Sequence, residues 1–450
     1  MSVKPTGPGL GLCPDVRPEA ERNFRWNAFW FAVDNIAFGI GLAFLNQSTV
    51  LPTFVSRLTE SPLLIGMIAT IQNGTWLLPQ LISAGLVAGK PRKRRYLLAP
   101  SVVGRPSYLI LAALVFTVGA ESSTLLLVAF FGAIALYTFC DGLTSVPWFD
   151  IYAKAIPADR RGRYTGAVQI AAGAIGIGLG GVVGYILAHP SLPFPRNYAV
   201  LFALAGVTGL LDLAALAMIR EPAEPAREVQ VRRSIGGFLR LVGPILRQDP
   251  RFLRVNLVRL AFGAGTVIFP FYIVYANRSL GLGAEHVGFF LSAQVAGGVV
   301  GALFLGLLTD HHGSHVAMRA AIASAALAPA IALLTHFAGP ALGPGLVYVT
   351  AGIFVAIGVT FSSWFLGFMN YLLEIAPPDQ RTTYTGLFNT IGGTLLVVPL
   401  LAGWLVEVAS YPPLFGLALA FIVAAGLGSL SLPESRAARP AAEAGAASSS

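Results

Sequence analysis

The sequence IPADRRGRYTG at residues 156–166 recurs as APPDQRTTYTG at residues 376–386, an offset of 220 residues. Two further matches have nearly the same offset: Ile65-Gly66 with Gln72 recurs as Val287-Gly288 with Gln294, and Ala37-Phe38-Gly39 recurs as Ala261-Phe262-Gly263. A nearly constant offset across half of the chain indicates a duplication. Parallel repeats of several helices are typical of transporters.

The composition excludes a soluble globular protein. Of the 450 residues, 55% are hydrophobic and 11% are charged, whereas a soluble domain carries roughly 25% charged residues. The formal charge of +9 comes from short basic segments between apolar runs. This pattern is typical of membrane topology, and we therefore expect the lipid bilayer, and no nucleic acid, as a partner.

Twelve apolar stretches are long enough to cross a bilayer core, which takes roughly 20 residues of helix. The stretches do not alternate every second residue, as the strands of a membrane barrel would. We therefore expect an all-α membrane protein of twelve transmembrane helices, arranged as two pseudo-symmetric six-helix bundles. The predicted spans are residues 26–54, 62–86, 96–119, 124–149, 164–187, 198–219, 255–277, 285–308, 316–337, 345–369, 384–408 and 413–432.

The distribution of Lys and Arg predicts the orientation. Of 30 basic residues, 25 lie in the segments that are inside if the N-terminus is cytoplasmic, and three, Arg57, Arg196 and Arg278, lie in outside loops. Cytoplasmic loops carry the excess of Lys and Arg, so we expect both termini in the cytoplasm. The ratio of 26 Arg to 4 Lys is typical of a bacterium with a GC-rich genome, and we expect a multi-pass protein of the bacterial inner membrane.

The domain boundaries follow from the same pattern. We predict a cytoplasmic N-terminal segment (1–25), a first bundle (26–219), a cytoplasmic linker (220–254), a second bundle (255–432) and a disordered cytoplasmic tail (433–450). The linker contains residues 234–241, which could lie on the membrane surface as a short amphipathic helix.

The loop between the predicted spans 285–308 and 316–337 reads GLLTDHHG at residues 306–313. It fits the G-x-L-x-D-x-x-G loop of the major facilitator superfamily, which the chain resembles over residues 25–432. The resemblance implies a conformational latch at Asp310, which can accept hydrogen bonds from a helix N-terminus, and Gly313, which permits a tight turn. The corresponding loop of the first half has Gly89 in place of the acid.

Five charged residues lie within the predicted spans at least four residues from either end: Asp34, Arg105, Asp141, Asp212 and Arg259. At 1.5 Å per residue, all lie roughly 6–14 Å from the cytoplasmic side. Charges inside a membrane are costly and are candidates for function by default.

The resemblance implies that the first, fourth, seventh and tenth helices line the central cavity. It therefore ranks Asp34, Asp141 and Arg259 as substrate or proton ligands, and Arg105 and Asp212 as secondary candidates on scaffold helices. We expect Asp34 or Asp141 to pair with Arg259 across the two halves when the inside is shut. The alternative is that each charge is paired within its own half.

Uncharged candidates for the substrate path are Gln72 and Asn73 in the second span and Trp364 in the tenth. Interhelical hydrogen bonding is the alternative role for the two amides. The duplicated loops contribute further candidates for the conformational latch. We expect Asp159 with Arg161, and Asp379 with Arg381, to form ion pairs that cap the helices that follow.

Several motifs do not indicate a functional site. Residues 85–91 fall one residue short of a P-loop, and we expect no metal site, because His311, His312 and His315 belong to the latch loop. Cys13 and Cys140 are expected to be free thiols. Asn277-Arg278-Ser279 is a glycosylation sequon that matters only in a eukaryotic secretory membrane.

These observations predict a monomeric secondary transporter, not an enzyme, that needs no cofactor and moves a small-molecule organic solute by alternating access. Coupling to protons is an interpretation of the buried acids, and uniport stays open, as do the substrate and the direction. One alternative is efflux of amphipathic compounds, although the helix-4 arginine and helix-5 Gly-Pro pair of the family's drug antiporters are missing. Another is a transporter-like receptor or assembly factor without transport.

Overall fold

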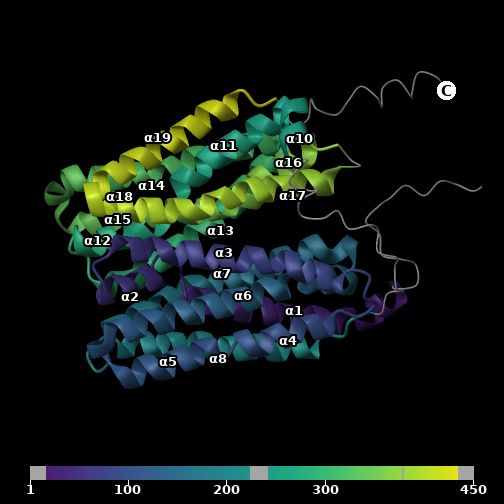
Figure 1. Cartoon of the computed structure of the whole chain (residues 1–450), viewed down its shortest axis with the longest axis horizontal. Helices are drawn as coiled ribbons and strands as arrows, with labels where there is room; N and C mark the ends of the chain where they lie inside the picture. The colour runs from purple at the N-terminus through teal and green to yellow at the C-terminus, as the bar shows by residue number, and fades with distance from the viewer. Residues whose placement is uncertain (1–16, 223–241, 378–379, 434–450) are drawn as a thin grey trace, which may run out of the picture. The chain divides into compact units, whose positions relative to one another are not determined.

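The computed structural model describes residues 17–222, 242–377 and 380–433, and every regular element in these ranges is a helix (Figure 1). The predicted surface helix at 234–241 and the predicted tail lie outside the described residues, apart from Pro433. The first half of the sequence forms α1 (Arg17–Phe44), α2 (Val50–Leu58), α3 (Pro62–Val87), α4 (Arg94–Gly104), α5 (Ser107–Val118), α6 (Ser123–Ala155), α7 (Ala158–Ala188) and α8 (Arg196–Met218). The second half forms α10 (Val242–Gln248), α11 (Pro250–Thr266), α12 (Phe269–Arg278), α13 (Val287–His312), α14 (Ser314–Leu342), α15 (Leu346–Ser363), α16 (Asn370–Ile375), α17 (Arg381–Gly392), α18 (Val398–Ala409) and α19 (Tyr411–Leu430).

The helices confirm an all-α membrane protein. Ten helical segments are long and apolar enough to cross a membrane, and one of them, residues 314–375, contains two predicted spans. The remaining predicted span is α3, whose 26 residues are about 39 Å long at 1.5 Å per residue. Ten segments are therefore consistent with twelve crossings.

Several predicted spans are broken rather than continuous. The first, 26–54, is divided at residues 45–49, where the Asn46 side chain accepts hydrogen bonds from Ser48 N (2.9 Å) and Thr49 Oγ1 (2.9 Å), as a side chain does in an Asx turn. The third breaks at Arg105-Pro106 and the seventh at residues 267–268. Pro106 lies in the first of these two breaks and Pro270 in the first turn of the helix that follows the second, and proline cannot donate to the preceding turn.

Packing divides the chain into two compact units. Unit 1 comprises residues 1–45, 71–176 and 193–232, and unit 2 comprises residues 46–70, 177–192 and 233–450. The units therefore differ from the two sequence halves by segments 46–70 and 177–192, which belong to the first half but pack within unit 2. Helices α3 and α7 contribute to both units.

Within unit 2, α13 and α15 approach closely because they meet at glycines. A Cβ atom at Gly358 would collide with the backbone at Gln294 and Gly298, and one at Gly297 would collide with the backbone of Val355. Small residues at such crossings let two helix backbones pack at short range in a membrane. The glycine-rich spans thus supply packing surfaces.

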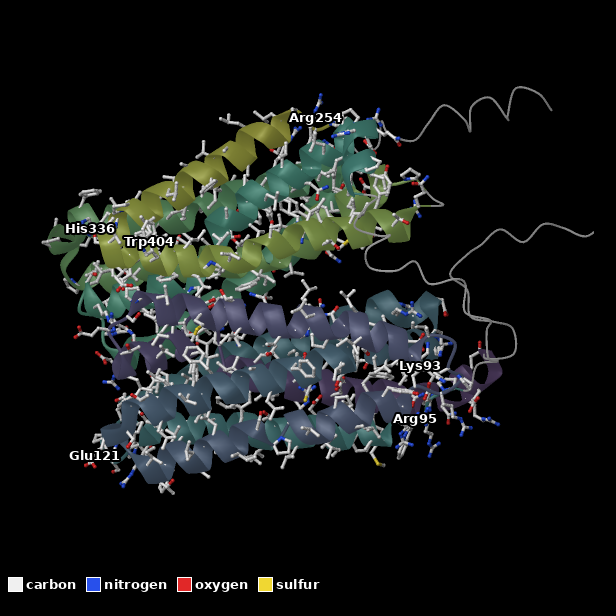
Figure 2. The ribbon with its side chains drawn as sticks, viewed as in Figure 1. Lys93, Arg95, Glu121, Arg254, His336 and Trp404 are labelled. Atoms are coloured by element: carbon white, nitrogen blue, oxygen red, sulfur yellow. The ribbon has the colours of Figure 1, made fainter. Side chains whose placement is uncertain are left out.

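Charged side chains at the ends of unit 1 agree with the predicted orientation. Figure 2 shows Lys93 and Arg95 at one end of this unit and Glu121 at the opposite end. Between the ends, large apolar side chains such as Leu78 and Ile110 are exposed. An exposed apolar belt between polar ends is what a bilayer requires of the surface that faces lipid.

Candidate functional site

Four charged side chains from four spans meet inside unit 1. They are Asp34 on α1, Arg105 at the end of α4, Asp141 on α6 and Asp212 on α8. Their side chains are 4%, 5%, 16% and 1% exposed, respectively. We call these four residues the charge cluster. Charges buried at this depth require partners, because the apolar surroundings solvate them poorly.

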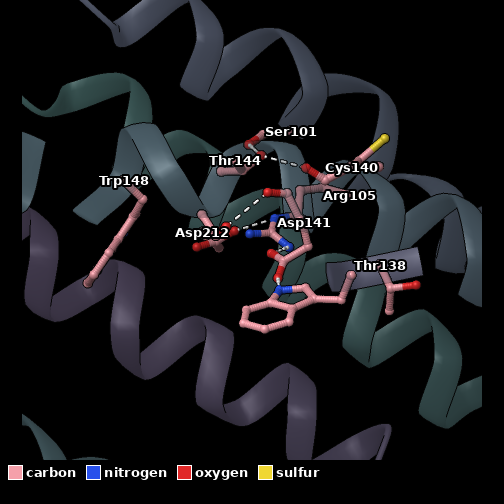
Figure 3. Close-up of polar contacts among 12 residues, drawn as sticks. Ser101, Arg105, Thr138, Cys140, Asp141, Thr144, Trp148 and Asp212 are labelled. Atoms are coloured by element: carbon pink, nitrogen blue, oxygen red, sulfur yellow. Dashed lines mark hydrogen bonds and ion pairs between the residues drawn. The ribbon is translucent and has the colours of Figure 1, made fainter. Parts of the chain in front are cut away.

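Arg105 is the centre of the charge cluster (Figure 3). Its Nη1 lies 3.0 Å from Asp141 Oδ1 and its Nε lies 2.5 Å from Asp212 Oδ2. The guanidinium also lies over the rings of Phe38 (5.3 Å) and Tyr137 (5.1 Å), where cation–π attraction favours the positive charge. Arg105 is the C-cap residue of α4 and retains helical backbone angles (φ −60°, ψ −37°) just before Pro106.

Two indoles orient the outer carboxyl groups of the charge cluster. Trp148 Nε1 donates to Asp34 Oδ2 (2.9 Å), and Trp76 Nε1 donates to Asp141 Oδ2 (3.0 Å). Arg105 thus joins Asp141 and Asp212 directly, and Asp34 is buried in the same cluster with its carboxyl group held by Trp148.

The charge balance of the cluster defines what it can do chemically. With all groups ionised, three carboxylates face one guanidinium, which leaves a negative excess. Asp212 has Arg105 as its ion-pair partner, and neither of its oxygens has a hydrogen bond of regular geometry from the described residues. Buried carboxyl groups in one site cannot all ionise easily, and a bound proton relieves the repulsion.

Two residues that were ranked as secondary candidates lie with the higher-ranked acids. Arg105 and Asp212, on the third and sixth predicted spans, join Asp34 and Asp141 in one cluster, and the role of each stays a prediction. The similar depth of the charges was the signal in the sequence that could have joined them. Trp76 and Trp148 were not predicted as ligands of the acids, because nothing in the sequence indicates which way an indole N–H points.

Arg259 lies in unit 2, buried on α11. Its Nη1 donates to the carbonyl of Phe388, and its guanidinium lies 4.0 Å from the centre of the Phe388 ring. A side chain at Gly392 would collide with it. In this structure Asp34 and Asp141 have partners inside unit 1, as the alternative of pairing within each half describes. Pairing of either acid with Arg259 stays a prediction for another state.

Of the three uncharged candidates for the substrate path, the structure describes the side chains of Gln72 and Asn73. Gln72 Oε1 and Gln294 Oε1 are buried and accept no hydrogen bond from the described residues, and the two positions match in the duplication. Asn73 is exposed on α3. The side chain of Trp364 lies outside the described ones, although its backbone belongs to a π-helical turn, a feature that is frequent at functional sites.

The latch residues lie at helix ends. Asp310 is exposed near the end of α13, and Gly313 terminates that helix with a φ of 90°, which favours glycine.

In the first duplicated loop, Asp159 lies 3.6 Å from Arg160, so the structure gives it a different neighbour from the expected Arg161. Arg161 donates to the carbonyls of Ala153 (2.7 Å) and Ile156 (3.0 Å) and so caps the end of α6. Arg381 begins α17, and Asp379 lies outside the described residues.

Comparison with known proteins gives one family. A family model described as the Major Facilitator Superfamily matches residues 36–396. A search of curated proteins found no match.

Solved transporters share the fold. A bacterial homologue of the iron transporter ferroportin, in an inward-facing state, is 14% identical with a TM-score of 0.68 and covers 90% of this chain and 98% of its own. The nucleoside transporter NupG is 12% identical with a TM-score of 0.63, over 90% of this chain and 98% of its own. A D-xylose–proton symporter is 16% identical with a TM-score of 0.63, over the same shares of both chains. At these identities the likeness concerns the fold.

Proposed function

Because this chain belongs to the Major Facilitator Superfamily, we propose that it is a secondary transporter that moves a small organic solute by alternating access and couples this movement to protons at the charge cluster. The burial of three carboxyl groups in one cluster with a single guanidinium, that of Arg105, carries the proposal. A site of this kind can gain and lose one proton without dismantling its other contacts.

The proposed contact of the charge cluster with the solute is formed by Asp141 and Trp76. Asp141 is the most exposed acid of the cluster, and Trp76, which donates to it, is 39% exposed. An indole that is exposed on its face and fixed by its N–H offers a surface on which an organic solute can stack.

The pattern along α3 places Trp76 on a polar face. Gln72, Trp76 and Gln80 recur every fourth residue and therefore share one side of the helix. Leu78, two residues after Trp76, lies on the opposite side and is 62% exposed. A membrane helix with one exposed apolar side and one polar side presents the first to lipid and the second to protein or to water. The polar side of α3 is therefore the proposed lining of the solute path.

Arg105 links the proposed solute site at Asp141 to the proposed proton site at Asp34 and Asp212. It contacts Asp141 and Asp212 at the same time, so a solute that binds Asp141 changes the share of positive charge available to Asp212. Solute binding at Asp141 would therefore change the electrostatic field at the proposed proton site. Solute and proton occupancy are thus coupled through one guanidinium.

The test is proton flux in proteoliposomes that contain the purified protein and an internal pH dye. A panel of sugars, nucleosides and organic amines is added outside, and the internal pH is followed. At least one solute should change the pH with the wild-type protein. Asp34→Asn and Asp212→Asn should abolish this change but retain exchange of labelled for unlabelled solute, which needs no net proton movement.

The control is Glu121→Gln, an acid at the end of unit 1 remote from the cluster. It should behave as the wild type. Proton flux that survives in both Asn variants would place the proton site elsewhere. Solute exchange by the wild type with no pH change for any transported solute would exclude proton coupling and favour uniport.

A further inference from the structure

The triplet Asn277-Arg278-Ser279, which reads as a glycosylation sequon, lies where two helices of different sequence halves meet inside unit 2. Asn277 and Arg278 end α12, from the second half, and α12 packs against α2, from the first. Both helix ends lie on the side that the Lys and Arg distribution predicts to be outside. We call this side the outer end.

Arg278 satisfies the carbonyl groups that α2 leaves free at its C-terminus. Its Nη2 donates to Ser56 O (2.8 Å) and Thr59 O (2.7 Å), and its Nη1 donates to Glu60 O (3.0 Å). The last carbonyls of a helix have no partner within the helix and carry its partial negative charge. One guanidinium from the second half therefore closes a helix end of the first half.

Asn277 makes a second polar contact between α12 and α2. Its Nδ2 donates to Thr53 Oγ1 at 3.3 Å, and the two residues are 224 positions apart in the sequence. This contact therefore joins the two sequence halves next to the hydrogen bonds of Arg278.

Two close helix contacts lie beside the contact of α2 with α12, and they occur at positions that correspond in the duplication. Gly66 on α3 packs directly on the backbone of Pro399 on α18. Its equivalent in the duplication, Gly288 on α13, packs directly on the backbone of Gly180 and Gly184 on α7. Each contact joins a segment of the first half to one of the second inside unit 2. Together with the Arg278 contact, they form what we call the outer seam.

We propose that Arg278 is a releasable clamp of the outer seam, which holds the outer end of the transporter closed and must let go of α2 for that end to open. The proposal rests on the transport function proposed above. Arg278 is exposed, so water can replace each of its hydrogen bonds to α2 when the helices separate. The glycine contacts set how closely the helices fit, and each is accompanied by one hydroxyl hydrogen bond, from Thr70 to Leu396 O (2.9 Å) and from Ser292 to Ile177 O (2.7 Å). Arg278 makes three hydrogen bonds to the end of α2 and is therefore the largest polar contact of the seam.

The first experiment asks whether the seam must open. Thr53→Cys and Asn277→Cys are combined in a Cys13→Ser/Cys140→Ala background, oxidised, and reconstituted in proteoliposomes. A disulfide between the two positions should abolish solute flux, and a reducing agent should restore it. Full flux with the disulfide formed would overturn the proposal, because it would show that α2 and α12 need not separate.

The second experiment measures opening without any substrate, so it separates failure of the clamp from failure of the proposed function. Ser48, fully buried in the turn that precedes α2, is replaced by Cys in the same background, and a membrane-impermeant maleimide is added outside. Arg278→Gln should raise the labelling rate about tenfold, which corresponds to the loss of roughly one net charged hydrogen bond. Arg196→Gln, at another outer loop, is the matched control and should leave the rate unchanged. An equal rate in the Arg278 and Arg196 variants would overturn the clamp.

Discussion

Removing the guanidinium of Arg105 tests the charge cluster most directly. In Arg105→Gln the contacts of 3.0 Å to Asp141 and 2.5 Å to Asp212 are lost together, and buried carboxyl groups remain without their cation. Breaking a buried pair by removing one partner costs about 3–5 kcal/mol. We expect a loss of this size in the free energy of unfolding, measured by SDS titration of the protein in mixed micelles.

The order of the other variants follows from the same contacts. Asp212→Asn should cost less than Arg105→Gln, because Arg105 keeps Asp141 as a partner. The double variant Arg105→Gln/Asp212→Asn should be more stable than the sum of the two single losses predicts, by about 0.5–3 kcal/mol, because it also removes a buried charge that the first change leaves uncompensated. Arg196→Gln, which removes an exposed arginine lying 5.5 Å from the Phe116 ring, is the control and should cost about 1 kcal/mol or less.

Two results would refute this reasoning. A loss below about 1 kcal/mol in Arg105→Gln would have the size of a surface ion pair and would mean that the cluster is not held by Arg105. Strict additivity of Arg105→Gln and Asp212→Asn would mean that these two residues do not interact in the folded protein.

Two further variants test the packing and the helix ends. Gly358→Ala should destabilise unit 2 by about 1–3 kcal/mol, because the new Cβ would collide with the backbone of α13. The control is Gly306→Ala, whose Cβ would have no atom within 4 Å and which should leave the stability unchanged. Equal free energies of unfolding of the two variants in SDS titration would contradict the close approach of α13 and α15. Glu221→Ala should cost about 0.5–2 kcal/mol, because the carboxylate accepts hydrogen bonds from the amides of Lys93 (2.7 and 3.0 Å) and Arg94 (2.9 Å) at the start of α4. Faster hydrogen exchange at residues 93–97 should accompany that loss, and unchanged exchange would show that Glu221 does not cap the helix.

The sequence determined the membrane class, the helical fold and the family. These follow from apolar run length, from the position of Lys and Arg, and from the repeated segments, all of which act locally or are set by the bilayer. It also identified each member of the charge cluster, because a charged residue within an apolar run is visible without a structure. The φ of 90° at Gly313 was likewise predictable from a single glycine in a tight loop.

The tertiary structure decided which of these charges belong together. Arg105 and Asp212 were ranked below Arg259 from the family's helix order, yet it is Arg105 that bridges Asp141 and Asp212. The partner of a buried charge depends on helix rotation and on breaks such as Arg105-Pro106, and neither can be read from composition or spacing.

For the outer seam, too, the sequence determined one part and the tertiary structure another. The sequence revealed that a duplication relates the two halves, but only the folded chain brings α2 of the first half against α12 of the second, with Asn277 beside Thr53. A duplication determines which segments correspond, since that is a property of the chain alone. Which segments of the two halves touch is decided by packing between helices that are far apart in the sequence.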